Sequence, residues 1–133
     1  MSTYRKTMSD ALKGVVVSHG TVATALVDAV RDITGDADAL VAISNEGCSR
    51  DSLGSLVAEA AGDGDCVLFV DLPGGSCLQA AMIFQRGRPA TAVVAGVNLA
   101  MLLDFVHHRD ASLAEAAARA ADIGASTIKV VVS

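Results

Sequence analysis

The chain has 133 residues, of which 52 % are hydrophobic and only 3 % aromatic, and its formal net charge is −5. This length suits one domain with an aliphatic core and is too short for two domains of usual size. The acidic balance and the scarcity of aromatic rings argue against binding to nucleic acid or to an anionic membrane, because those functions need a basic surface or stacking side chains.

Neither a membrane span nor a secretion signal is evident. No apolar run approaches the roughly 20 residues that cross a bilayer, and residues 1–13 are polar where a signal peptide would be apolar. We therefore expect a cytoplasmic protein with an N-terminal tail at 1–13 and one domain at 14–133. Cys48, Cys66 and Cys77 form no C-x-x-C pair, so we expect free thiols and no bound metal.

Apolar runs of strand length alternate with segments of helical periodicity from residue 14 onward. The first predicted elements are a strand at 14–18, a helix at 21–33 and a strand at 39–44. A helix capped by Ser49 follows, then a strand at 66–71, a helix at about 76–86, a strand at 91–95 and a helix at 99–108. Ser112 and Glu115 form a capping box that opens an alanine-rich helix ending at Gly124, and a last strand is predicted at 127–132.

The first four predicted strands are rich in valine and show little alternation, which is typical of strands covered by helices on both faces. The sequence therefore predicts an α/β fold with a doubly wound, mainly parallel sheet and helices on both faces. The last strand follows two consecutive helices, so the pattern leaves its direction and its sheet open. In the first three helices the periodicity places these apolar residues inward: Val22, Leu26, Val30 and Ile33, then Leu53, Leu56, Val57 and Ala60, then Leu78, Ala81 and Met82.

Candidate catalytic residues follow the first and third predicted strands, at the sheet edge where α/β proteins bind ligands. His19 follows the apolar run at 14–17 and is either a nucleophile at the rim or a residue that only caps the next helix. Asp71 ends the third strand and either orients the His19 imidazole or serves only in the turn. If the two strands are neighbours, the carboxylate can bond one ring nitrogen and leave the other nitrogen free to attack.

Gly74, Gly75 and Ser76 form the turn between the third strand and the next helix. Small residues let helix N–H groups approach an anion, which makes this turn a candidate phosphate-binding site, although a plain tight turn fits the same pattern. No Gly-Lys-Ser/Thr follows, so a nucleoside triphosphate with magnesium is not expected. Together with His19 and Asp71, the turn predicts phosphoryl transfer without a metal or a cofactor.

Three ordered segments resemble those of one family. Gly14-Val-Val-Val-Ser-His-Gly20 looks like a phosphorylation-site strand, Val67-Leu-Phe-Val-Asp-Leu-Pro-Gly-Gly-Ser76 like a second active-site loop, and Ala95-Gly-Val-Asn-Leu-Ala-Met-Leu-Leu103 like a Gly-Val-Asn helix start. The chain thereby resembles the mannose-type enzyme IIA (EIIA) family of the bacterial phosphoenolpyruvate-dependent sugar phosphotransferase system (PTS), over almost all of 14–133.

This resemblance implies a phosphotransferase component that serves sugar uptake. His19 would take a phosphoryl group from phospho-HPr and pass it to an enzyme IIB. Asp71 would be hydrogen-bonded to the other ring nitrogen, and Ser76 and nearby amides would contact the phosphate. Family members are typically homodimers in which the C-terminal strand crosses to the partner's sheet. They contact the membrane only through transporter subunits. Cys77 and Ala100 stand where similar proteins usually have proline, next to helix starts.

Three alternatives stay open at this stage. A metal or redox protein would use His19, Cys48 and Cys77. A stand-alone regulator would use the same phosphorylation to bind different proteins, and a phosphoryl donor of dihydroxyacetone kinase would share the fold. His107 and His108 are expected to form a solvated helix end rather than a metal site, because adjacent residues point to different helix faces.

Overall fold

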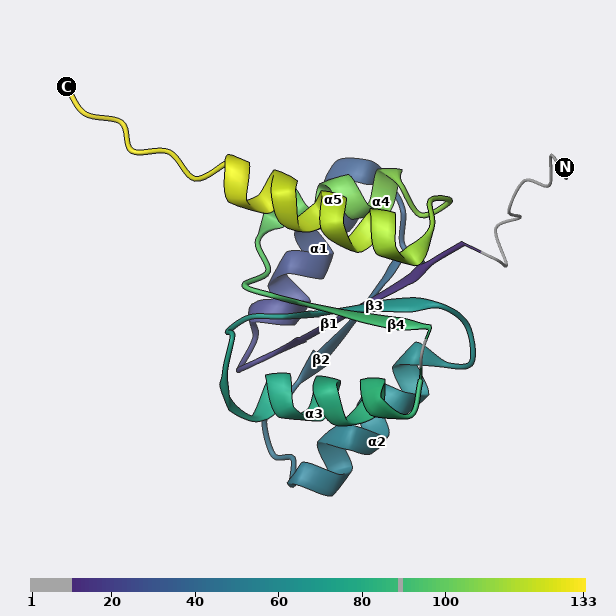
Figure 1. The fold of residues 1–133 in the computed structure, drawn as a ribbon. Coiled ribbons are helices and arrows are strands. Elements are labelled where there is room, and N and C mark those ends of the chain that lie inside the picture. Colours follow the sequence, from purple (N-terminus) through teal and green to yellow (C-terminus); the bar gives the residue numbers. More distant parts are fainter. Residues whose placement is uncertain (1–10, 89) are drawn as a thin grey trace, which may run out of the picture.

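The computed structural model describes residues 11–88 and 90–133, in which a four-stranded sheet lies between two layers of helices (Figure 1). All strand pairs are parallel, in the order β2-β1-β3-β4. The strands are β1 (Lys13–Ser18), β2 (Leu40–Ser44), β3 (Cys66–Val70) and β4 (Thr91–Ala95). The helices are α1 (Val22–Thr34), α2 (Arg50–Ala61), α3 (Gly75–Arg86), α4 (Leu99–His107) and α5 (Leu113–Ser126). The predicted parallel α/β fold is confirmed.

The central strands β1 and β3 are buried on both sides. Val16 and Phe69 pack on one face with side chains of α1, α4 and α5, whereas Val15 and Leu68 pack on the other face with side chains of α2 and α3 (Figure 1). Successive residues of one strand thus enter two separate apolar cores. This double burial is the physical reason why the strand sequences show no alternation of apolar and polar residues.

The order of the strands reverses between β1 and β3. The chain passes from β1 through α1 to β2 on one side, and α2 then carries it past β1 to β3 on the other side. Val17 pairs with Val70, so β1 and β3 end at the same edge of the sheet. His19 and Asp71, which follow soon after, therefore lie at the switch point where ligands bind in such folds.

Helix α5 extends past the glycine at which the sequence predicted its end. It runs to Ser126, and Gly124 is a buried residue inside it. An added Cβ at Gly124 would lie only 2.7 Å from the Met101 side chain, so this glycine allows α5 to pack closely on α4 and does not end the helix. The predicted starts are confirmed at two helices, since the side chains of Ser49 and Ser112 cap α2 and α5.

Four side chains that the periodicity placed inward are exposed instead: Val22, Ile33, Leu56 and Met82. Several helices share each face of the sheet, so every helix buries only a narrow stripe (Figure 1). In α2 the buried stripe is Leu53, Val57 and Ala61, and in α3 it is Cys77, Ala80 and Ala81.

Residues 127–133 form no strand, so the prediction for 127–132 is wrong for the single chain. They leave the end of α5 and extend away from the domain (Figure 1), with Ile128, Val130, Val131 and Val132 between 76 % and 94 % exposed. A strand needs a neighbouring edge for its backbone N–H and C=O groups. Within the part of the chain that the structure describes, this segment lies beside no such edge.

Most of the predicted N-terminal tail, residues 1–10, lies outside the described residues. Leu12 is fully buried, its N–H donates to the carbonyl oxygen of Arg109, and β1 begins at Lys13. The end of the predicted tail thus joins the folded domain. No helix within 11–88 or 90–133 is long and apolar enough to span a membrane.

Candidate functional site

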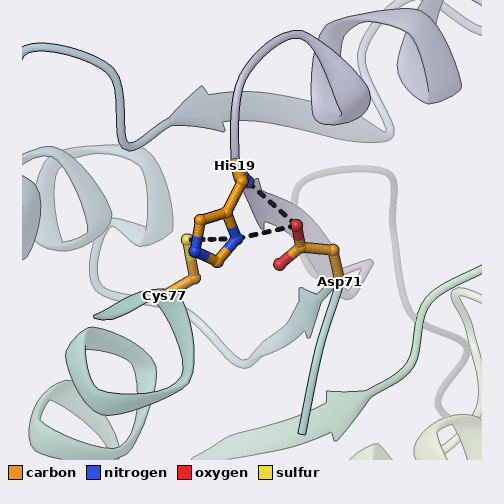
Figure 2. A group of neighbouring side chains, drawn as sticks. All are labelled: His19, Asp71 and Cys77. Carbon is orange, nitrogen blue, oxygen red and sulfur yellow. Dashed lines mark hydrogen bonds and ion pairs between the residues drawn. The ribbon is translucent and has the colours of Figure 1, made fainter. Parts of the chain in front are cut away.

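The centre of the site is a double contact between His19 and Asp71 (Figure 2). Oδ2 of Asp71 accepts hydrogen bonds from the backbone N–H of His19 and from ring atom Nδ1, each at 2.9 Å. An ionised carboxylate only accepts hydrogen bonds, so Nδ1 carries the hydrogen and Nε2 keeps its lone pair. The His19 side chain is 42 % exposed, whereas that of Asp71 is 14 % exposed. The arrangement leaves an imidazole nitrogen that can act as a nucleophile on a ring that solvent reaches.

Hydrogen bonds from His19 favour the ionised form of Asp71. Burial alone would raise the pKa of this carboxyl group, yet the hydrogen bonds from the backbone and the ring of His19 lower the pKa below its usual value. Asp71 is therefore ionised near neutral pH. A fixed negative charge at 2.9 Å from Nδ1 stabilises any positive charge that develops on the ring.

The N-terminus of α3 lies beside the His19 ring. Gly75 has φ +87°, a conformation that L side chains rarely adopt, and a Cβ built on it would lie 3.7 Å from Nε2 and Cε1 of His19. The first turn of a helix has backbone N–H groups without partners in the helix, and these bind anions. The predicted turn of Gly74, Gly75 and Ser76 thus lies beside Nε2 of His19, where its N–H groups could bind an anion.

Asn45, to which the sequence assigned no role, links three segments of the site. Its Oδ1 accepts a hydrogen bond from the N–H of Gly20 at 3.4 Å, and its Nδ2 donates to Oγ of Ser76 at 3.5 Å. The same side chain lines a surface cavity of about 260 Å³ together with Arg50 and Gln79. Its place at the end of β2, on the same edge as His19, is the signal that could have identified it.

Ser18 fixes the segment that carries His19. It is fully buried, and its Oγ accepts a hydrogen bond of 2.6 Å from the N–H of Ala23 in the first turn of α1. Thr21, at the start of that helix, makes no side-chain cap of its own. A buried hydroxyl from the strand end thus replaces the cap and ties the loop to the helix.

Cys77 is the third side chain at the His19 ring. It is buried in the first turn of α3, and its Sγ lies 3.9 Å from Nδ1 of His19. Burial and the negative charge of Asp71 raise the pKa of the Cys77 thiol, so the sulfur is protonated near neutral pH. All three cysteines are free thiols, as predicted.

The metal or redox set of His19, Cys48 and Cys77 is not assembled. Sγ of Cys48 donates to the carbonyl oxygen of Ser44, and Cys48 does not belong to the group of metal-ligating side chains found within 11–88 and 90–133, which is His19, Asp71 and Cys77. His107 and His108 bond through Nδ1 to carbonyl oxygens of their own helix. They therefore belong to a helix end, as expected.

Comparison with known proteins agrees with the fold. The family model described as "PTS system fructose IIA component" (EIIA-man) matches residues 13–122. This chain belongs to the mannose-type EIIA family. It is thus a IIA component of the phosphotransferase system, and the resemblance to this family is confirmed. A search among curated proteins finds no significant match.

Solved structures are similar to this IIA component over most of its length. The mannose/sorbose-specific IIA subunit of Enterococcus faecalis is 28 % identical, with a TM-score of 0.78, and the match covers 92 % of this chain and 96 % of that one. A phosphotransferase EIIA component from Streptococcus agalactiae is 19 % identical, with a TM-score of 0.77, 89 % of this chain covered and 96 % of that one. The second likeness shows the shared fold.

Proposed function

We propose that this IIA component carries a phosphoryl group on Nε2 of His19, which it takes from phospho-HPr and passes to an enzyme IIB for sugar uptake. The observation that carries the proposal is the double hydrogen bond from His19 to Oδ2 of Asp71, which leaves Nε2 with its lone pair at the surface. The E. faecalis relative, a mannose/sorbose-specific IIA subunit, supports the same role in sugar transport.

In the proposed step, the lone pair of His19 Nε2 attacks the phosphorus of phospho-HPr. A new N–P bond forms while the N–P bond to the HPr imidazole breaks, so no metal, cofactor or further reactant is needed. The His19 ring becomes cationic because Nδ1 keeps its hydrogen, and the carboxylate of Asp71 stabilises this charge. The reverse step on an enzyme IIB regenerates the neutral ring.

The start of α3 supplies the anion site in this mechanism. Backbone N–H groups of Gly75 and Ser76 bind the phosphoryl oxygens, and Gly74 keeps the approach free of a side chain. The side-chain amide of Asn45 connects Gly20, next to His19, with Ser76 in this anion site.

We also propose that the chain functions as a homodimer. The apolar side chains of 127–133 are exposed, and the segment extends from α5 without pairing with any strand in the described part of the chain. A second copy can offer a sheet edge to this segment and remove its apolar side chains from water.

The test is transfer from phospho-HPr to purified variants. His19→Ala should lose labelling and keep its fold, because the ring is 42 % exposed and contributes little to the core. His107→Ala and His108→Ala are matched controls and should label normally. The product should be acid-labile and alkali-stable, as a phosphoramidate is.

Labelling that survives in His19→Ala, or that His107→Ala abolishes equally, would refute the assignment of His19. Transfer onward to an enzyme IIB distinguishes the transport role from the two alternatives that share the first step. A regulator would keep its phosphoryl group in the presence of an enzyme IIB, and a donor of dihydroxyacetone kinase would transfer to that kinase instead.

A further inference from the structure

Three chemically different donor atoms meet beside the His19 ring. Nδ1 of His19, a carboxylate oxygen of Asp71 and Sγ of Cys77 all lie within 4.8 Å of one another. Figure 2 shows these side chains converging from three elements, namely the end of β1, the end of β3 and the first turn of α3. The proposed phosphoryl transfer uses the first two residues and has no task for the thiol.

The spacing of these atoms is close to that of a tetrahedral zinc site. Bonds of about 2.0–2.2 Å to nitrogen and oxygen and about 2.3 Å to sulfur place ligand nitrogen and sulfur about 3.5 Å apart, and nitrogen and oxygen about 3.4 Å apart. The observed separations are 3.9 Å for Nδ1 and Sγ and 2.9 Å for Nδ1 and Oδ2. Both separations differ from those of a zinc site by about 0.5 Å or less.

A second observation concerns the other oxygen of the Asp71 carboxylate. Oδ1 of Asp71 is buried and has no hydrogen-bond partner among residues 11–88 and 90–133. A buried carboxylate oxygen without a partner is costly unless a cation or a donor reaches it. A thiolate, an imidazole and a carboxylate together select Zn²⁺ or Cd²⁺ over Mg²⁺ and Ca²⁺, which prefer oxygen ligands alone.

We propose that His19, Asp71 and Cys77 bind one Zn²⁺ ion, and that this ion blocks the phosphorylation of His19. On binding, the Cys77 thiol releases its proton to water and Sγ coordinates the metal as a thiolate. Nδ1 of His19 exchanges its hydrogen for the metal, and that hydrogen moves to Nε2. The ion has three protein ligands and a fourth position for water on the side where His19 is exposed.

Zinc would block phosphorylation because it changes the tautomer of His19. Nε2 has the lone pair while Nδ1–H bonds Asp71, but it carries the hydrogen once Nδ1 binds the metal. A protonated Nε2 has no electron pair for the phosphorus. Zinc would therefore inhibit the phosphorylation of this chain, and the inhibition would depend on Cys77. The zinc site stands on the geometry alone, whereas its effect on labelling rests on the proposed function.

Binding is tested on the unphosphorylated full chain by competition with a chromophoric zinc chelator. We expect one Zn²⁺ per chain, and with Co²⁺ we expect a thiolate-to-metal absorption band in the near ultraviolet. Cys77→Ala should weaken zinc binding by about 100-fold or more, since losing a group that only supports a ligand already costs about 10–100-fold. Cys48→Ala is the matched control and should bind as the unmodified chain does, and circular dichroism checks that both variants fold.

Absence of zinc binding, absence of the Co²⁺–thiolate band, or equal binding by Cys77→Ala would overturn the site. The band is measured on the unmodified chain, so it decides the matter even if Cys77→Ala does not fold. In the labelling assay with phospho-HPr, zinc should stop phosphorylation of the unmodified chain but not of Cys77→Ala. Binding without inhibition would overturn the block alone, and a chain that is never labelled, with or without zinc, would contradict the proposed function and leave the zinc site standing.

Discussion

Replacing Asp71 by asparagine removes a charge while it keeps the size and shape of the side chain. Oδ2 of Asp71 accepts two hydrogen bonds of 2.9 Å from His19. A hydrogen bond to a charged group contributes about 1.5–3 kcal/mol, and a neutral one about 0.5–1.5 kcal/mol, so each bond should lose about 1 kcal/mol. Because solvent reaches the His19 ring, the lower limit applies, and the free energy of unfolding should fall by about 2 kcal/mol in total.

The rate of phosphorylation depends mainly on the bond to the ring. Loss of about 1–1.5 kcal/mol of stabilisation of the cationic ring slows transfer about tenfold. An asparagine that turns its amide N–H₂ toward Nδ1 also selects the tautomer with hydrogen on Nε2, an error that costs about 10⁴-fold in a serine-protease triad. We therefore expect Asp71→Asn to be labelled between about tenfold and 10⁴-fold more slowly than the unmodified chain.

The assay is single-turnover labelling by phospho-HPr, combined with urea unfolding followed by circular dichroism. Asp104→Asn is the matched control, because the Asp104 side chain is only 7 % exposed, pairs with Arg119 and His108, and also has a buried oxygen without a partner in the described part of the chain. This control should lose stability but keep its labelling rate. An unchanged labelling rate in Asp71→Asn would refute the role of the carboxylate.

The dependence of stability on pH gives a second measurement on the same pair. The pKa of Asp71 is lowered in the folded chain from its usual 3.8, so the unfolded state binds this proton more tightly. The stabilisation by the ionised carboxylate is thus fully present above the usual pKa and is lost as the pH falls through the lowered pKa. The stability difference between the unmodified chain and Asp71→Asn should hold near neutral pH and shrink below about pH 4.

The remaining predictions concern packing and assembly. Gly14→Ala should destabilise the fold by about 1–3 kcal/mol in urea unfolding, because its Cβ would lie 2.5 Å from Leu40 and 2.6 Å from Phe105, both buried. Gly54→Ala in α2 meets no atom within 4 Å and should stabilise the fold by about 0.4–1 kcal/mol, so a loss in both variants would contradict the packing argument. Removal of 127–133 should leave a folded monomer by light scattering, since this exposed segment adds nothing to either core; a dimer of unchanged stability would disprove strand exchange.

The order of strands and helices can be predicted from the sequence because it depends on local patterns. Valine-rich runs without alternation indicate strands covered on both faces, and helix starts at Ser49 and Ser112 follow from short capping patterns. The same local reasoning places His19 and Asp71 after two strands. It also identifies the Gly74–Ser76 turn as a helix start, since each of these inferences needs only neighbouring residues.

Tertiary structure alone decides which of these segments meet. The pairing of β1 with β3 brings together His19 and Asp71, which are 52 positions apart in the chain. Asp71 therefore hydrogen-bonds to the His19 ring and does not serve only in the turn. Cys77 reaches the ring, and Asn45 joins the loops, only because α3 begins and β2 ends at the same edge of the sheet. Whether 127–133 form a strand is likewise not determined by the local sequence, because a strand exists only where another strand completes its hydrogen bonds.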